Sequence, residues 1–156
     1  MSNDAYRSRV LDAISQVVVD LALPGIEAVV VRHRDKQTGT EKFPCVEIRR
    51  DTSPDVENNL TAEHDEVGYG VRVAFRFRDS GGPNSPAPRS DSWHEQLAHA
   101  FRNRQSMSPK LPNMPEVRAV TIEPLTIGSI ATDAANMIEG GMVVRVFIVE
   151  PRGPLS

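Results

Sequence analysis

Two segments of this chain place hydrophobic residues in the pattern of β-strands. The first spans residues 67–78, where hydrophobic positions alternate with arginine or alanine: Val71, Val73, Phe75 and Phe77. A period of two puts one face of a strand in a core and the other toward water or a partner. The second segment, residues 142–150, is hydrophobic almost throughout, which is typical of a central strand.

Hydrophobic residues recur with a helical period in two other segments. Near the N-terminus they form one stripe: Val10, Leu11, Ile14, Val17, Val18 and Leu21. Pro24 and Gly25 are expected to end this helix, since proline cannot continue it and glycine accepts the turn. A second helix is predicted to open at Ser92, because Ser92 and Glu95 have capping-box spacing, and to fray near Arg104.

Three further strands are predicted, at residues 26–32, 43–50 and 117–123. The polar stretch between the first two contains Gly39, which is typical of a hairpin loop. Residues 51–66 and 79–90 are expected to be loops, the second because it is rich in glycine, proline and serine. Residues 125–141 are expected to connect the last two strands, with a helical turn as a candidate at 131–138.

The resulting order of elements is α-β-β-β-α-β-β. It predicts an α+β fold, a two-layer sandwich in which a mainly antiparallel sheet carries two helices on one face. At 156 residues the chain is expected to form a single domain over residues 1–150, followed by a C-terminal tail at 151–156.

Composition narrows the classes of function. The net charge is −3, so the basic footprint of a nucleic-acid-binding protein is not expected. The single cysteine, Cys45, allows no intrachain disulfide and falls inside a strand pattern, where we expect a buried thiol. No hydrophobic stretch approaches the roughly 20 residues of a membrane helix, and the first residues lack the pattern of a secretion signal. We therefore expect a protein that folds in the cytoplasm, without a membrane.

Charged residues are segregated along the chain. Residues 51–66 contain six acidic residues and no lysine or arginine. Arg72, Arg76 and Arg78 share one face of the alternating strand, and Arg145 is expected to extend this row from the last strand. The row is either a water-exposed sheet face or an oligomer interface, where arginine pairs with the carboxylates of a neighbour. Nucleic-acid binding is a third option, weakened by the negative net charge and by aromatic residues at only 5%.

No group of residues predicts a catalytic, cofactor-binding or metal site. His94 and His99 are separated by about 140° around a helix, so they cannot converge on one metal ion. The acidic segment lacks the residue order of a calcium-binding EF-hand loop. The two Gly-Gly pairs lack the spacing of a phosphate-binding loop, and no Gly-x-Ser-x-Gly elbow occurs. We therefore expect no cofactor and no enzyme activity.

The order of elements carries a resemblance to a known family. Its pieces are residues 10–21, 43–50, 69–78, 93–104, 117–123 and 142–150. Together they resemble the tail-terminator, or tail-completion, proteins of long-tailed bacteriophages. These have a leading amphipathic helix, three strands, a helix with a Leu-Ala-x-Ala-Phe-like stripe, and two strands with a long connection. The pieces cover nearly the whole chain, and the family shares architecture and size more than any signature motif.

The resemblance implies a structural virion protein. Such proteins are similar in forming a hexameric ring that caps the finished tail tube and offers a docking surface to the head. The implied partners are copies of the chain itself, the tail tube protein and the head connector or stopper protein. DNA is expected to pass through the lumen without specific binding. The implied location is the head–tail junction of a virion assembled in the host cytoplasm.

A closed ring needs head-to-tail interfaces between complementary surfaces. The basic tip at residues 32–42 and the acidic segment at 51–66 are candidates for such a pair, and acidic groups that line a lumen would repel DNA phosphates. The candidate subunit or partner interface comprises Arg32, Arg34, Lys36, Lys42, Asp55, Glu57, Glu63, Asp65, Glu66, Arg72, Arg76, Arg78 and Arg145.

Two alternative interpretations remain. One is another neck or connector protein, although connector adaptors are mostly helical and stoppers are small β-barrels, which suits the predicted order less well. The other is a small α+β domain that binds a ligand or catalyses a reaction.

Overall fold

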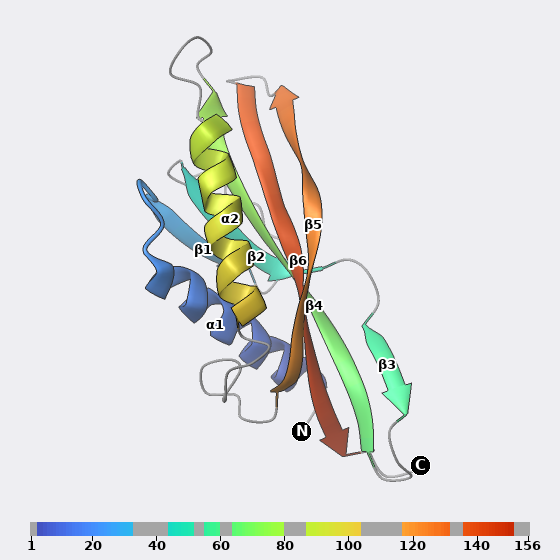
Figure 1. The fold of residues 1–156 in the computed structure, drawn as a ribbon. Coiled ribbons are helices and arrows are strands. Elements are labelled where there is room, and N and C mark those ends of the chain that lie inside the picture. The colour runs from blue at the N-terminus through green and yellow to red at the C-terminus, as the bar shows by residue number, and fades with distance from the viewer. Residues whose placement is uncertain are drawn as a thin grey trace.

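In the computed structural model, two helices cover one face of a sheet (Figure 1). The structure describes residues 3–32, 44–51, 55–59, 64–79, 87–103, 117–131 and 136–151. The helices are α1 (Asn3–Leu21) and α2 (Ala87–Asn103). The strands are β1 (Ala28–Arg32), β2 (Cys45–Arg50), β3 (Val56–Asn59), β4 (His64–Asp79), β5 (Val117–Ala131) and β6 (Asn136–Pro151).

The strands form one sheet in the order β1-β2-β4-β6-β5, and β3 pairs with the first part of β4. The described pairs are antiparallel, except that β1 runs parallel to β2. The predicted α+β two-layer fold, its mainly antiparallel sheet and its order α-β-β-β-α-β-β are therefore confirmed. The short strand β3 is an addition, and it lies inside the acidic segment, for which the sequence predicts a loop.

The pairing of β1 with β2 corrects one prediction. The two strands run in the same direction, with Ala28 opposite Cys45 and Arg32 opposite Arg49. Parallel neighbours cannot be joined by a tight turn, because the chain must return to the end where the first strand began. The predicted hairpin is therefore wrong, although residues 33–43 themselves lie outside the described part of the chain. A polar, glycine-containing stretch indicates a change of direction but not which way the next strand pairs.

The hairpin of β5 and β6 is longer than the sequence predicts. β5 continues to Ala131 and β6 begins at Asn136, so the connection expected at 125–141 and its helical turn at 131–138 are both wrong. Pro124 interrupts the strand pattern in the sequence. β5 lies at the edge of the sheet, however, and there a proline is tolerated because its missing N–H can face away from the neighbouring strand.

The start of α2 also differs from the prediction, whereas the end of α1 does not. α1 ends at Leu21, before Pro24, as expected. α2 begins at Ala87, so Ser92 lies inside the helix, where its Oγ accepts a hydrogen bond from Gln96 Nε2 at 3.0 Å. The capping-box prediction is wrong because residues three apart are also ordinary neighbours on a helix surface.

The hydrophobic core lies between the helices and the sheet, and alternate residues of β4 and β6 face it. Three aromatic side chains meet there. Phe75 and Phe77 of β4 contact Trp93 of α2, with ring centroids 6.3 and 4.6 Å away. Trp93 Nε1 donates a hydrogen bond to the carbonyl oxygen of Pro24 at 3.0 Å, so the buried indole keeps its polar group satisfied.

Candidate interaction surface

The sheet face that points away from the helices carries the predicted arginine row, and we call it the outer face. Successive residues of a strand point to opposite faces, so the burial of alternate β4 residues in the core sends Arg72 and Arg76 outward. Arg145 of β6 lies opposite Gly70 of β4 and shares this face. The structure therefore brings three of the predicted interface residues to one surface.

Glu47 of β2 is paired with two arginines on the outer face. Its Oε2 lies 3.2 Å from Arg76 Nη1, and its Oε1 lies 3.7 Å from Arg49 Nε. Glu47 is only 4% exposed, and a buried charge is costly unless it is paired. The two ion pairs therefore stabilise a carboxylate that the strand would otherwise bury alone.

Arg145 lies against the backbone of β4. Its side chain donates a hydrogen bond from Nη1 to the Gly68 carbonyl oxygen at 3.3 Å, and its Nε lies 3.7 Å from Glu123 Oε1. Two glycines make room for it: a Cβ would lie 3.2 Å from Arg145 Cδ at Gly68 and 3.5 Å from Nη1 at Gly70. At 7% exposed, this arginine is part of the folded structure rather than a solvated surface charge.

Charges on the outer face are therefore compensated within one chain. Arg76 and Arg145 have acidic partners of their own, and Arg72 also interacts within the chain. A neighbouring copy that used these arginines would have to share or displace the carboxylates they already contact. The outer face thus serves first to hold β2, β4 and β6 together.

The acidic segment is paired in part. Asp55 accepts a hydrogen bond from Arg7 Nε at 3.1 Å, and Glu66 Oε2 lies 3.4 Å from Arg118 Nη1. Glu57 of β3 differs, because its side chain is exposed and makes no ion pair or hydrogen bond with any described residue. Asp65 of β4 is half-buried and also interacts within the chain. The side chains of the remaining predicted interface residues lie outside the described part of the chain: Arg32, Arg34, Lys36, Lys42, Glu63 and Arg78.

A second polar group, the N-terminal cluster, lies where the start of α1 meets the sheet; it comprises Tyr6, Arg7, Asp55, Tyr69 and Glu150. The Tyr69 hydroxyl donates a hydrogen bond to Glu150 Oε1, and both residues are buried. Tyr6 stacks on the Tyr69 ring with centroids 6.5 Å apart, and the Arg7 guanidinium lies 5.7 Å from the same ring. Burial, followed by the hydrogen bond to Glu150, raises the pKa of Tyr69 above its ordinary value.

The N-terminal cluster was not predicted from the sequence. The sequence does contain an indication of it, because alternation along each strand places Tyr69 and Glu150 at core-facing positions. A polar group at a core position needs a partner, so each of the two residues implies a hydrogen bond. The sequence alone did not show that they are each other's partner.

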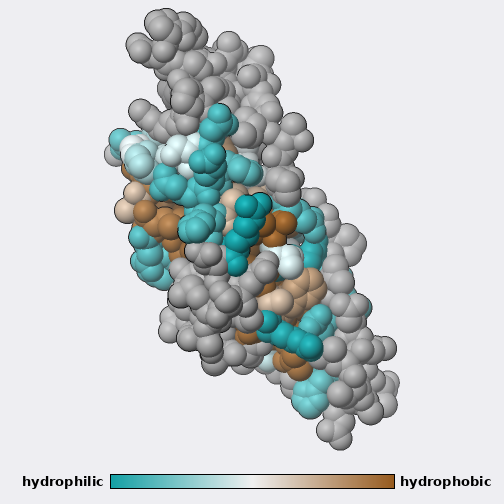
Figure 2. Space-filling model, in the orientation of Figure 1, coloured by the Kyte–Doolittle hydropathy of each residue, from teal (hydrophilic) through white to brown (hydrophobic). Residues whose placement is uncertain are grey.

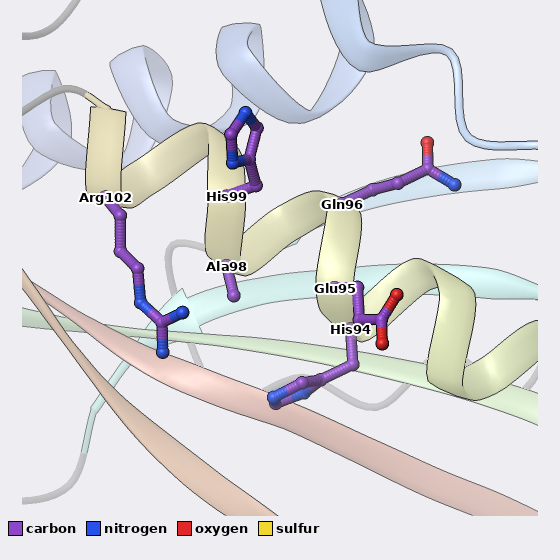
Figure 3. Close-up of a pocket in the computed structure, with 6 residues that line it drawn as sticks. All are labelled: His94, Glu95, Gln96, Ala98, His99 and Arg102. Carbon is purple, nitrogen blue, oxygen red and sulfur yellow. The ribbon is translucent and has the colours of Figure 1, made fainter.

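A solvent-open hollow of about 480 Å³ follows α2. Its lining residues are His94, Glu95, Gln96, Ala98, His99 and Arg102. Figure 3 shows His94, Ala98 and Arg102 on the side of α2 toward the strands, and His99 on the other side. The two imidazoles thus point apart, as their spacing predicts. Among the described residues, no three histidine, cysteine, aspartate or glutamate side chains gather where they could hold a metal ion.

Exposed hydrophobic surface is scarce on the described part of the chain. Val19 of α1 is the large hydrophobic residue exposed there, at 52%, and Cys45 is buried as expected. Figure 2 shows hydrophobic areas on the helix side as small patches between hydrophilic residues. Neither α1 nor α2 is long and apolar enough to cross a membrane. Partner contacts made by these residues would therefore depend mainly on polar and charged groups.

Comparison with known proteins does not assign the chain to a family. The chain matches no protein-family model and no curated protein. The functional interpretation therefore rests on the fold and on the charged residues described above.

Proposed function

We propose that this chain is a structural virion protein of a tailed bacteriophage. In this proposal, copies of the chain assemble into a ring, expected to be a hexamer, that terminates the tail tube and joins it to the head connector. The observation that carries the proposal is the order α-β-β-β-α-β-β in two layers, which the described elements follow with the short strand β3 added, and on which the resemblance to tail terminators depends. The proposed activity is assembly, so the relevant residues are those of the molecular surface.

A ring requires each copy to offer two different surfaces that complement each other. β3, which belongs to the acidic segment, pairs with the first part of β4, whereas α2 packs near its last part (Figure 1). One copy therefore has distinct surfaces at the two ends of its sheet, which a head-to-tail interface needs. The acidic segment is one candidate surface, and the basic tip at residues 32–42 remains its predicted complement.

The proposal also assigns roles to the remaining partners. The two rims of the ring would contact the tail tube protein on one side and the head connector or stopper protein on the other. Acidic side chains that face the lumen would repel DNA phosphates and let the genome pass without binding.

Deletion of the gene from a phage that encodes this chain tests the proposal. Negative-stain imaging of the lysate should show tails of uncontrolled length if the protein terminates the tube. Tails of normal length beside unattached heads would instead assign it to head–tail joining, the role of another neck protein. Virions of normal appearance without the protein would contradict both roles. Expression of the wild-type chain from a plasmid, which should restore normal virions, is the control.

Light scattering after size exclusion tests ring formation directly. The expected mass is a whole multiple of the 17.2 kDa chain, with six copies as the first expectation. Some rings assemble only on a tail, so the measurement is repeated by imaging the protein with purified tail tubes. A chain that stays monomeric in solution and does not decorate tube ends would contradict the proposal.

A further inference from the structure

Most charged side chains in the described part of the chain already have partners. Among the arginines whose side chains the structure describes, most pair with acids or contact aromatic rings, and Arg72 also interacts within the chain. Arg50 and Arg102 are exposed and make no ion pair or hydrogen bond with a described residue. Arg102 lies in the last turn of α2, where a positive charge also suits the helix dipole. Among the described residues, its guanidinium group has no acidic partner and can therefore bind a carboxylate from another chain.

Arg102 lines the hollow along α2. Figure 3 shows Arg102 and His94 on the same side of the helix, turned toward each other across Ala98. Ala98 is small and buried, so it leaves space between them. Glu95 also lines the hollow but points away from Arg102 (Figure 3). Because a guanidinium group binds a carboxylate through two parallel hydrogen bonds, the Arg102 end of the hollow fits an acidic side chain.

Four exposed acids make no side-chain ion pair or hydrogen bond with a described residue: Glu27, Glu57, Asp91 and Glu95. Glu27 is the one acid of residues 21–34, which also contain Arg32 and Arg34, so its surroundings in the sequence are not acidic. Asp91 and Glu95 lie on α2 itself, and a contact of α2 with α2 would be symmetric and would not propagate around a ring. Glu57 lies on β3, beside the start of β4 and away from α2 (Figure 1). It is exposed and unpaired among the described residues, within a segment that contains no lysine or arginine.

We propose that Arg102, with His94 beside it, binds the carboxylate of Glu57 from a second copy of this chain. The hollow on α2 is then one half of the subunit interface, and the edge strand β3 is the other half. The inference rests on the proposed ring, and it assigns the hollow on α2, in place of the basic tip at residues 32–42, as the surface that meets the acidic segment. Nucleic-acid phosphate is a less suitable occupant, because Arg102 is the one lysine or arginine among the described residues that line the hollow, whereas a nucleic-acid site presents a patch of several.

A charge swap tests this pairing. Arg102→Glu and Glu57→Arg should each weaken self-association about tenfold or more, because a like-charge contact replaces an ion pair at the interface. The double variant Arg102→Glu/Glu57→Arg should recover most of the lost affinity. Association is measured by sedimentation velocity and by imaging rings on purified tail tubes. Arg50→Glu is the matched control: it makes the same charge change at the other exposed, unpaired arginine and should leave association unchanged.

Each outcome decides the inference. If rings form with wild-type affinity from either single variant, the inference is wrong and the proposed function stands. Weakening by both single variants without recovery in the double variant also contradicts the pairing of these two residues. If the wild type forms no ring in solution or on tubes, the proposed function fails and the inference fails with it. Unchanged thermal unfolding shows that the variants are folded, and Arg102→Gln and Glu57→Gln replace any that is not.

Discussion

The two faces of β4 are built from alternating residues of one strand, yet different forces hold them. On the core face, valine and phenylalanine side chains pack beneath the helices. On the outer face, Arg76 pairs with Glu47 of β2, and the backbone of Gly68 accepts a hydrogen bond from Arg145 of β6. Hydrophobic packing can use any neighbour of suitable shape, whereas a buried ion needs one particular partner. The alternating pattern of β4 therefore predicts which residues face the core, but it does not predict which ionic partners hold the outer face together.

The largest effect is expected on the core face, from Phe75→Ala. The change removes a ring that contacts Trp93 and Phe77, and we expect the free energy of unfolding to fall by about 3–5 kcal/mol. Urea unfolding followed by circular dichroism measures it. Val19→Ala, at an exposed hydrophobic residue, is the control and should change it by about 0.5 kcal/mol or less. A loss below about 1 kcal/mol for Phe75→Ala would place this ring outside the core.

On the outer face, Glu47→Ala should lower the free energy of unfolding by about 2 kcal/mol, because Arg76 and Arg49 lose a buried carboxylate. A double-mutant cycle with Arg76→Ala should give a coupling energy of about 1 kcal/mol. The same urea titration measures both quantities. Additive effects, with no coupling, would mean that the outer face is held by something other than its ion pairs.

At the end of the core face, Tyr69→Phe should lower the free energy of unfolding by about 1–2 kcal/mol, because buried Glu150 loses its donor. Tyr6→Phe is the matched control, since the ring that stacks on Tyr69 is kept. Equal effects of the two changes would show that the hydroxyl of Tyr69 contributes nothing specific.

The same hydroxyl predicts a dependence on pH. The pKa of Tyr69 is raised in the folded chain, so the folded state keeps its proton when the unfolded state loses it near pH 10.0. The stabilisation that the protonated Tyr69 hydroxyl contributes is fully present below that pH and is lost as the pH rises above it. The free energy of unfolding should therefore fall more steeply between pH 9 and pH 11 in the wild type than in Tyr69→Phe. Parallel curves would contradict the prediction.

The smallest effect is expected from Arg118→Ala, also on the outer face. The Arg118 side chain is 55% exposed, so its pair with Glu66 is screened by water. We expect a change of about 0.5 kcal/mol or less in the free energy of unfolding. A loss above about 1.5 kcal/mol would show that the ions of the outer face act as one network rather than as separate pairs.

Much of the fold could be predicted from the sequence because its elements have clear periods. The stripe from Val10 to Leu21 and the alternation from Val71 to Phe77 each select one element and one buried face. The direction of β1 relative to β2 could not be predicted in this way. Strand direction depends on how distant segments pair, and Gly39 indicates only a turn.

The candidate surfaces could be predicted only in part, for a related reason. Alternation placed Arg72, Arg76 and Arg145 on one face, but it did not name their partners. The partners of Tyr69 and Glu150 are even harder to predict, because 81 positions separate them in the chain. The register of β4 against β6 places Glu150 opposite Asp65 and Tyr69 opposite Val146, so the Tyr69 and Glu150 side chains share a face and meet along the strands, and that register is a property of the whole sheet.

The position of β6 has a consequence for how the protein is made. β6 pairs with β4 on one side and β5 on the other, yet it follows both of them in the chain. A nascent polypeptide that has reached residue 131 already contains both helices, but β4 and β5 have no strand between them. The middle of the sheet can therefore close only after residues 136–151 have been synthesised, and until then two strand edges stay open to aggregation.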